Sequence, residues 1–323
     1  MSFIPLSPCC LQGGRLTGEP RGCFVPANDT QKVGRYHAKP SDGVIVDDKV
    51  ALVLYTDAFG LGLPNPKVMA DAFADQLKIN VFVPEYISKS VMLSLCHENH
   101  HENPNKSKAI VTTDEADEMC VDLTFAVDPP PVDVYDPVAP LYPDQYAARS
   151  WGTTIYMIGE VLWKTWRWLP MLLFPKKQVP LAQASLNDLT SEGFEKVVAV
   201  GYCRGGAMVQ YLLANQANTT LVGGIICHPS PEKSTWAGID KPTKWHLADH
   251  DQMFGDKDIQ LLKNTFQKKV DEDRSKFECV VHQDTVHGFA ARPTLEHEPT
   301  KKAFDEANAS AIDFCKKQLL ARE

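Results

Sequence analysis

Short apolar runs rich in β-branched residues alternate with helix-length stretches along most of the chain, and this alternation limits the folds open to it. Residues 49–57 contain a continuous apolar run at 50–55, as in a strand buried on both faces. Five further runs resemble strands: residues 79–85, 195–201, 221–228, 243–249 and 277–284. Apolar spacing predicts helices over residues 66–77, 206–216 and 301–319. The pattern predicts an α/β fold with a mostly parallel central sheet and helices on both faces.

Composition narrows the class of protein. The chain has 323 residues, a net charge of −8 and 44% hydrophobic residues, which is an ordinary globular balance. The acidic charge argues against a nucleic-acid partner. The N-terminal residues lack a basic region followed by an apolar region, so we expect no secretory signal. Nine cysteines in a chain this long lead us to expect reduced thiols and a cytoplasmic location.

One stretch departs from the alternation. Residues 109–148 contain nine Asp and Glu, no Lys or Arg, and the proline-rich run DPPPVDVYDPVAPLYP. We interpret this stretch as part of a surface excursion, at about residues 97–150, from a single α/β domain that spans residues 1–323. The next stretch, residues 151–175, is apolar, but Glu160, Lys164 and Arg167 interrupt it. We therefore expect no membrane span there but a helix that packs on the body or covers a pocket, with a membrane-surface helix as the alternative.

The five residues Gly201-Tyr202-Cys203-Arg204-Gly205 lie between a predicted strand and a predicted helix. They form G-x-C-x-G, the thiol version of the G-x-S-x-G nucleophile turn. A turn this sharp strains the backbone of its central residue and requires small residues two positions before and after it. The N-terminus of the following helix favours a thiolate or an oxyanion at the turn. Cys203 is therefore a candidate nucleophile, and a buried core thiol is the alternative reading.

Candidate partners for Cys203 follow it in the order that this turn requires, an acid and then a histidine. Asp249 and Asp251 end one predicted strand, and His282 and His287 lie in or just after another. We favour His287, because it follows the strand and precedes a glycine, whereas His282 falls inside the apolar run. We favour Asp251 as the acid. Asp249 remains an alternative, and either aspartate could instead cap a turn.

Several segments resemble the dienelactone hydrolase (carboxymethylenebutenolidase) family of α/β-hydrolases: GYCRGG, ADHDQMF, HGFAAR and TDAFGLGLPN. The N-terminal PCCLQGG and GEPRG resemble its fungal-type members, and the similarity lapses in the acidic stretch through about Phe174. The resemblance implies a triad of Cys203, His287 and Asp251, with an oxyanion hole formed by the backbone N–H groups of Ala58 and Arg204.

Two further site residues rest on the resemblance alone. Asp57 occupies the place of a family glutamate that contacts the resting thiol, but it is one methylene shorter. Arg292 lies near a family arginine that binds the substrate carboxylate, although its spacing is offset. A second such arginine is not identified, and Arg149 is the only suggestion.

The predicted function is a hydrolase that opens lactones or esters through a thioester on Cys203. It needs no metal or organic cofactor, acts on a small molecule without a nucleic-acid or membrane partner, and is a monomer or homodimer. The alternative is a hydrolase-fold binding module or thiol sensor with little catalytic activity.

Two other groups of residues have two readings each. The run CHENHH at residues 96–101 is a solvated loop or a metal site, and Trp163, Trp166 and Trp168 line a pocket or pack in the core.

Overall fold

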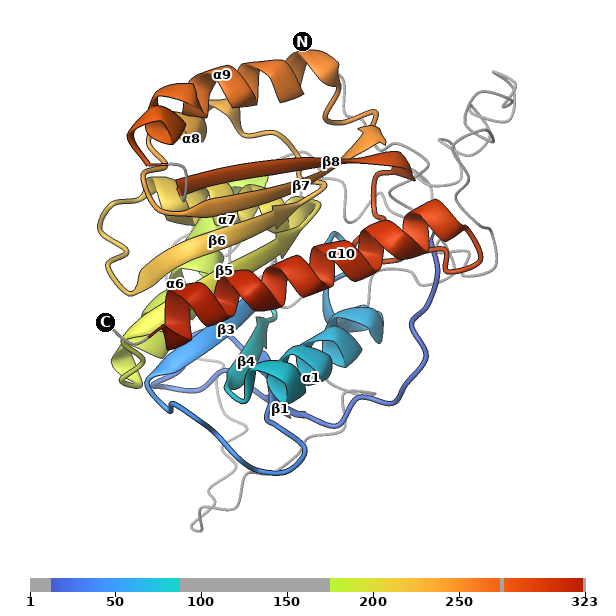
Figure 1. Cartoon of the computed structure of the whole chain (residues 1–323). Coiled ribbons are helices and arrows are strands. Elements are labelled where there is room, and N and C mark those ends of the chain that lie inside the picture. Colours follow the sequence, from blue (N-terminus) through green and yellow to red (C-terminus); the bar gives the residue numbers. More distant parts are fainter. Residues whose placement is uncertain (1–12, 88–174, 274–275, 322–323) are drawn as a thin grey trace, which may run out of the picture.

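The computed structural model describes residues 13–87, 175–273 and 276–321, and the strands of this part form one eight-stranded sheet. The strand order is β1-β2-β4-β3-β5-β6-β7-β8. β1 pairs with β2, and β2 with β4, in antiparallel fashion. All other neighbours in this order, from β4 and β3 through to β7 and β8, are parallel (Figure 1). The strands are Cys23–Val25, Arg35–Ala38, Val50–Tyr55, Asn80–Pro84, Lys196–Tyr202, Leu221–Cys227, Thr243–His250 and Phe277–Val286, numbered β1 to β8 in chain order. The predicted α/β class with a mostly parallel sheet is confirmed.

Helices cover both faces of the sheet. On one face lie α1 (Asn65–Leu77) and α10 (Glu298–Cys315), which Figure 1 shows together in front of the sheet. On the other face lie α6 (Val179–Ser191), α7 (Arg204–Ala214) and α9 (Asp256–Glu272). The shorter helices are α8 (Lys233–Trp236), η2 (Gly60–Gly62), η4 (Pro175–Gln178) and the π-helical η6 (Lys316–Leu320).

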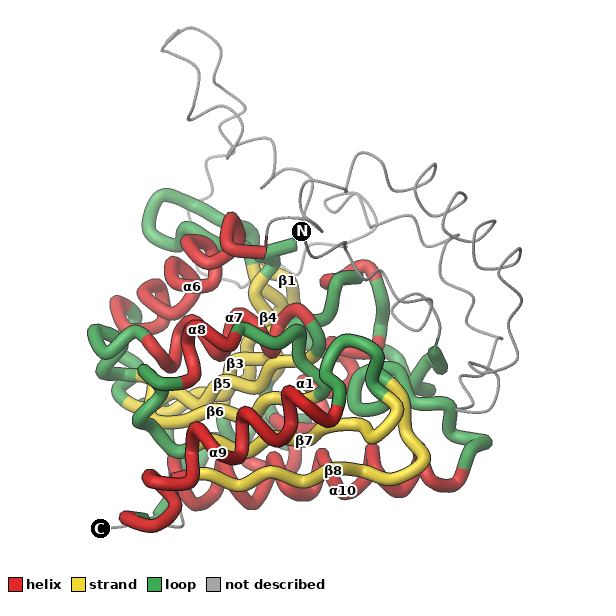
Figure 2. The backbone as a smooth tube through the Cα atoms, turned by 90° about the horizontal axis from the view of Figure 1, so that it is seen from above, coloured by secondary structure: helices red, strands yellow, loops and turns green. Residues whose placement is uncertain are grey.

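Burial on two faces explains the continuous apolar runs of the sequence. Along β3, Leu52 and Leu54 face the core under α1 and α10, whereas Ala51 and Val53 face the core under α6 and α7. Successive side chains of a strand point to opposite faces, so a strand between two helical layers needs apolar residues at every position. Figure 2 shows β8 as the outermost strand on its side of the sheet.

The N-terminal strands were not predicted. β1 and β2 contain three and four residues and form an antiparallel pair that extends the parallel sheet beside β4. Cys23 of β1 is disulfide-bonded, so the expectation of reduced thiols is wrong at this position. Four other described cysteines form no disulfide bond: Cys203, Cys227, Cys279 and Cys315.

Some predictions concern residues outside the described ranges. They are the excursion at about residues 97–150, the apolar stretch 151–175, the CHENHH run, Arg149 and the three tryptophans at 163, 166 and 168. Among the helices that are described, none has both the length and the hydropathy to cross a membrane.

Candidate active site

Cys203 stands at the junction of β5 and α7, in a backbone conformation that residues other than glycine rarely adopt. Its φ and ψ are 52° and −111°, and its side chain is buried. The backbone N–H of Cys203 donates to the carbonyl oxygen of Cys227 in β6 at 3.1 Å, which ties the turn to the neighbouring strand. Since α7 begins at Arg204, the positive end of the helix lies at the thiol.

Two glycines make this turn possible. A Cβ atom on Gly201 would lie 2.4 Å from the carbonyl oxygen of Gly205. A Cβ atom on Gly205 would lie 2.0 Å from the carbonyl oxygen of Tyr55 in β3. Both distances are far inside van der Waals contact, and both obstacles are backbone atoms that no side-chain rotation can move. The turn therefore has the small residues that the sequence predicts two positions before and after Cys203.

We expect Gly205→Ala to lower the free energy of unfolding by about 3 kcal/mol or more, because the added methyl group forces β3 and α7 apart. Urea denaturation followed by circular dichroism would measure the loss. Gly255→Ala is the matched control, because a Cβ atom at Gly255 meets nothing within 4 Å. Equal stability of the two variants would contradict this account of the turn.

His287 and Asp251 meet beyond the ends of two neighbouring strands, β8 and β7. Nδ1 of His287 lies 2.8 Å from Oδ2 of Asp251, and both side chains are almost completely buried. The backbone N–H of Met253 donates to Oδ1 of Asp251 at 2.8 Å, so both carboxylate oxygens are held. Gly288, with φ of 97°, turns the chain immediately after His287. The carboxylate therefore fixes the orientation of the imidazole from its Nδ1 side.

Electrostatics favour a charged His287. Burial alone lowers the pKa of His287, but the Asp251 carboxylate and the Cys203 thiolate outweigh burial and raise the pKa above its ordinary value. Cys203, the third residue of the predicted triad, is therefore close enough to His287 to influence the pKa of the imidazole. No hydrogen bond of regular geometry reaches Nε2 of His287 from the described residues. Hydrogen bonds of this kind are often long before a substrate binds.

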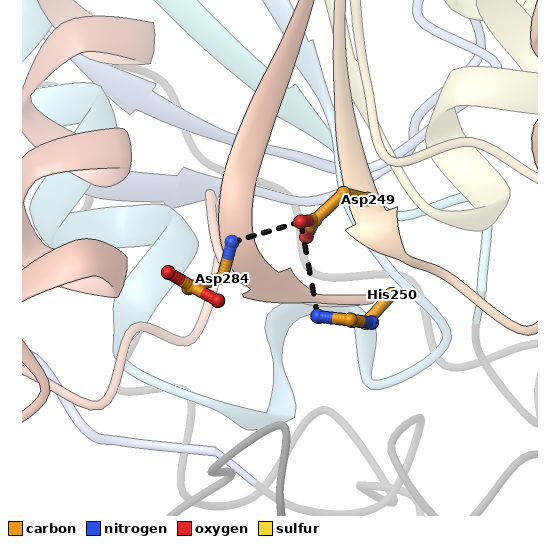
Figure 3. A group of neighbouring side chains, drawn as sticks. All are labelled: Asp249, His250 and Asp284. Carbon is orange, nitrogen blue, oxygen red and sulfur yellow. Dashed lines mark hydrogen bonds and ion pairs between the residues drawn. The ribbon is translucent and has the colours of Figure 1, made fainter.

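Asp249, the alternative acid, has a different position. Its carboxylate accepts the backbone N–H groups of Asp284 at 2.9 Å and Thr285 at 3.0 Å, in a sharp turn of the chain within the last residues of β8, where Asp284 has a φ of 53°. Figure 3 shows Asp249 between the backbone of Asp284 and the exposed ring of His250, whose Nε2 atom is 3.7 Å from Asp249. The ligand atoms of these three residues are close enough to hold a cation, but they lie at the surface and Asp249 already caps the turn. The structure thus brings Asp251, rather than Asp249, to His287.

Asp57 and Arg292 form a buried ion pair. Nε of Arg292 donates to Oδ2 of Asp57 at 2.7 Å, and the guanidinium lies 4.9 Å from the ring centre of Phe59. The other carboxylate oxygen of Asp57 accepts the backbone N–H of Phe59 at 3.0 Å. The helical turn from Gly288 returns the chain so that Arg292 and His287 lie in the same site. The two residues that the resemblance assigned to thiol gating and substrate binding therefore contact each other.

The register of the sheet brings the two predicted oxyanion donors to one level. Tyr55 of β3 pairs with Gly201 of β5, and the strands are parallel. Ala58 and Arg204 each come three residues after that pair, at the same edge of the sheet. The N–H of Arg204, in the first turn of α7, has no acceptor within its own helix.

Three residues near the site were not identified from the sequence. The hydroxyl of Tyr86 donates to the carbonyl oxygen of Thr56 at 2.5 Å. Burial raises the pKa of Tyr86 well above its ordinary value, and the negative charges of Asp57 and Cys203 raise it further. His228 packs against His287. Asn65 holds the turn before Arg292, because its Nδ2 donates to the carbonyl oxygen of Ala291 at 2.9 Å.

Only weak sequence features pointed to these three residues. Tyr86 and His228 each lie at the end of a predicted strand, where side chains of a parallel sheet gather. Asn65 lies in the segment TDAFGLGLPN but had no assigned role. His282, the alternative base, is buried and faces His246, with 3.0 Å between ring nitrogens, so it is a packed histidine.

Comparisons with known proteins agree with the fold. Residues 164–319 match the model of the dienelactone hydrolase family. The chain is 22% identical to the hydrolase pyvD of Aspergillus violaceofuscus and 21% identical to the hydrolase tropI of Talaromyces stipitatus, each over 97% of both chains. Its fold is similar to that of a dienelactone hydrolase-like promiscuous phosphotriesterase from metagenomic libraries, with a TM-score of 0.54, 15% identity and coverage of 92% and 97% of the two chains. It is also similar to esterase 2 of Thermogutta terrifontis, with a TM-score of 0.54, 12% identity and coverage of 96% and 100%. The resemblance noted in the sequence is confirmed by this match: residues 164–319 are similar to the dienelactone hydrolase family.

Proposed function

We propose that the protein hydrolyses lactones or esters through a thioester on Cys203, with His287 as the base and Asp251 as the residue that orients it. One observation carries this proposal. The buried pair of His287 and Asp251, 2.8 Å apart, lies within electrostatic reach of a cysteine on a strained strand-to-helix turn. A core thiol needs neither a strained backbone nor an adjacent carboxylate–imidazole pair.

The first half of the reaction forms the thioester. His287 accepts the proton of the Cys203 thiol, and the sulfur attacks the carbonyl carbon of the substrate. The N–H groups of Ala58 and Arg204 stabilise the oxyanion, at about 3 kcal/mol for each donor. As the C–O bond breaks, the imidazolium of His287 returns its proton to the leaving oxygen. In a lactone that oxygen remains attached to the acyl group.

The second half releases the acid. His287 takes a proton from a water molecule, whose oxygen attacks the thioester carbonyl. The C–S bond then breaks, and the Cys203 sulfur is reprotonated. Asp251 holds the same tautomer of His287 through both halves. Every proton passes through side chains of the site, and no cofactor takes part in a step.

We further propose that substrates bear a carboxylate that pairs with Arg292. Arg292 is an almost completely buried cation in the site, and its present partner is the carboxylate of Asp57 at 2.7 Å. A substrate carboxylate would take the place of Asp57 on the guanidinium.

We expect Arg292→Met to reduce kcat/KM for a carboxylate-bearing ester about 10-fold to 100-fold more than for its methyl-ester analogue, because a hydrogen bond to a charged group contributes about 1.5–3 kcal/mol. The ratio of the two substrates within each variant is the measurement, since it cancels any loss of folded protein. Arg292→Lys should keep part of the preference. An unchanged ratio in Arg292→Met would exclude Arg292 as the carboxylate partner.

The function itself is tested by a panel of lactones and aryl esters assayed on the wild type and on Cys203→Ala. We expect turnover by the wild type alone. Acid quenching during turnover, followed by mass spectrometry of the intact protein, should show one acyl group on Cys203. Equal turnover by Cys203→Ala would overturn the proposal. Ligand binding without turnover of any panel member would favour the binding-module alternative.

A further inference from the structure

His228 is a buried histidine that the proposed mechanism does not use. It is the first residue after β6, the strand that lies between the Cys203 strand and the Asp251 strand. Its side chain has no solvent exposure. Its ring meets the ring of His287 edge to face, with 5.0 Å between the centroids and 77° between the planes. The ring of Phe289 contacts it as well, at 5.5 Å.

The backbone around His228 is fixed to the elements that carry the site. The residue has a φ of 34°, and its N–H donates to the carbonyl oxygen of His246 in β7 at 2.7 Å. Two residues later, the N–H of Ser230 donates to the carbonyl oxygen of Cys203 at 3.1 Å. A strained residue persists only where its surroundings determine its conformation. The backbone of His228 is therefore fixed relative to Cys203 and β7, and the rings of His287 and Phe289 pack against its side chain.

His228 contacts His287 as a neutral ring. Burial lowers the pKa of His228 well below its ordinary value, and the positive charges of His287 and Arg292 lower it further. Neither ring nitrogen of His228 has a hydrogen-bond partner among the described residues. The interaction with His287 is thus one of ring packing, in an edge-to-face geometry that aromatic pairs favour.

We propose that His228 is a positioning residue for His287: its ring packs against the imidazole of His287 and keeps that imidazole turned toward Cys203. The bond from Nδ1 of His287 to Asp251 fixes one point of the imidazole, about which the ring can still swing. The edge-to-face contact with His228 blocks that swing on one side. This inference rests on the proposed function, since it assigns His228 a role only through His287.

The test compares variants that keep or remove the ring. The measurements are the rate of Cys203 alkylation by iodoacetamide as a function of pH, and kcat and KM for an ester. In His228→Leu, we expect the alkylation midpoint to rise by about one pH unit and kcat to fall about 10-fold to 100-fold, because a misplaced base stabilises the thiolate less. KM should stay within about threefold, since the ring of His228 packs on His287 and is neutral, so its removal takes no charge from the neighbourhood of Arg292. His228→Phe should restore kcat and the midpoint most of the way, because it keeps a flat ring.

The matched control is His282→Gln. His282 is also buried and also contacts the ring of Phe289, at 5.0 Å, but its recorded ring contacts are with His246 and Phe289 rather than His287. Its variant should therefore keep the wild-type midpoint. An effect in His282→Gln as large as that in His228→Leu would show general loosening of the core and overturn the proposal. His228→Phe as impaired as His228→Leu would overturn it too, because the ring would then not be what matters.

His287→Ala separates this inference from the proposed function. If His287→Ala moves the alkylation midpoint and His228→Leu does not, the positioning role is wrong while the proposed function stands. If His287→Ala leaves the midpoint unchanged, the proposed function fails and the inference with it. Should His228→Leu fail to fold, His228→Met replaces it, since it also removes the flat ring at similar volume.

Discussion

Cys203→Ser is expected to fold normally and to lose turnover by about 100-fold or more, the usual contribution of a well-placed general base. The serine hydroxyl is far harder to deprotonate than a thiol, whose pKa is about 8.5 in a free cysteine. A serine therefore depends wholly on an aligned base. The Cys203 thiolate raises the pKa of His287, so a nucleophile that ionises readily and forms an ion pair with the imidazolium suits this site better than a hydroxyl.

The measurement is kcat for an activated aryl ester, together with the thermal midpoint of each protein. Cys279→Ser is the matched control. Cys279 is a partly buried thiol without a disulfide bond in β8, which is separated from the Cys203 strand β5 by β6 and β7. It should keep wild-type turnover. Turnover near the wild-type level in Cys203→Ser would contradict a mechanism that depends on sulfur.

Asp251→Asn is expected to reduce kcat by about 10⁴-fold while the fold survives, as when the acid of such a triad is replaced by its amide. The amide no longer selects the tautomer in which Nδ1 of His287 carries the proton. It also removes the carboxylate charge that raises the pKa of His287, so the imidazolium becomes less stable. Alkylation of Cys203 should then require a higher pH than in the wild type.

Asp249→Asn is the matched control for this variant, because Asp249 is a residue of β7 only two positions before Asp251, which follows the strand. It weakens one of the two backbone hydrogen bonds to the last residues of β8, and we expect a loss of stability of about 1 kcal/mol with turnover within a few-fold of the wild type. Steady-state kinetics and urea denaturation of the two variants provide the comparison. A larger kinetic loss in Asp249→Asn would transfer the orienting role to Asp249.

The sequence alone predicted the sheet core and the nucleophile turn, because both depend on local patterns. A strand buried on two faces must be apolar at every position, and the predicted run at residues 49–57 contains β3. The glycines at 201 and 205 mark a turn that admits no Cβ atom, so the position of Cys203 could be read from five residues. β1 and β2, with three and four residues, are too short for such a pattern, and they form only because β4 offers an open edge.

The tertiary structure decided which residues of different strands and loops contact each other. Asp249 and Asp251 both end the same predicted strand, and no local feature of the sequence separates them. The pairing of β7 with β8 shifts in register between Ala248 and His250; Asp249 meets the backbone of β8, and Asp251 meets His287. Asp57 pairs with Arg292 across 235 positions of sequence, and His228 meets His287 through the order of the strands. Such contacts depend on the register and order of strands that are far apart in the chain, and residue patterns within one segment carry no information about either.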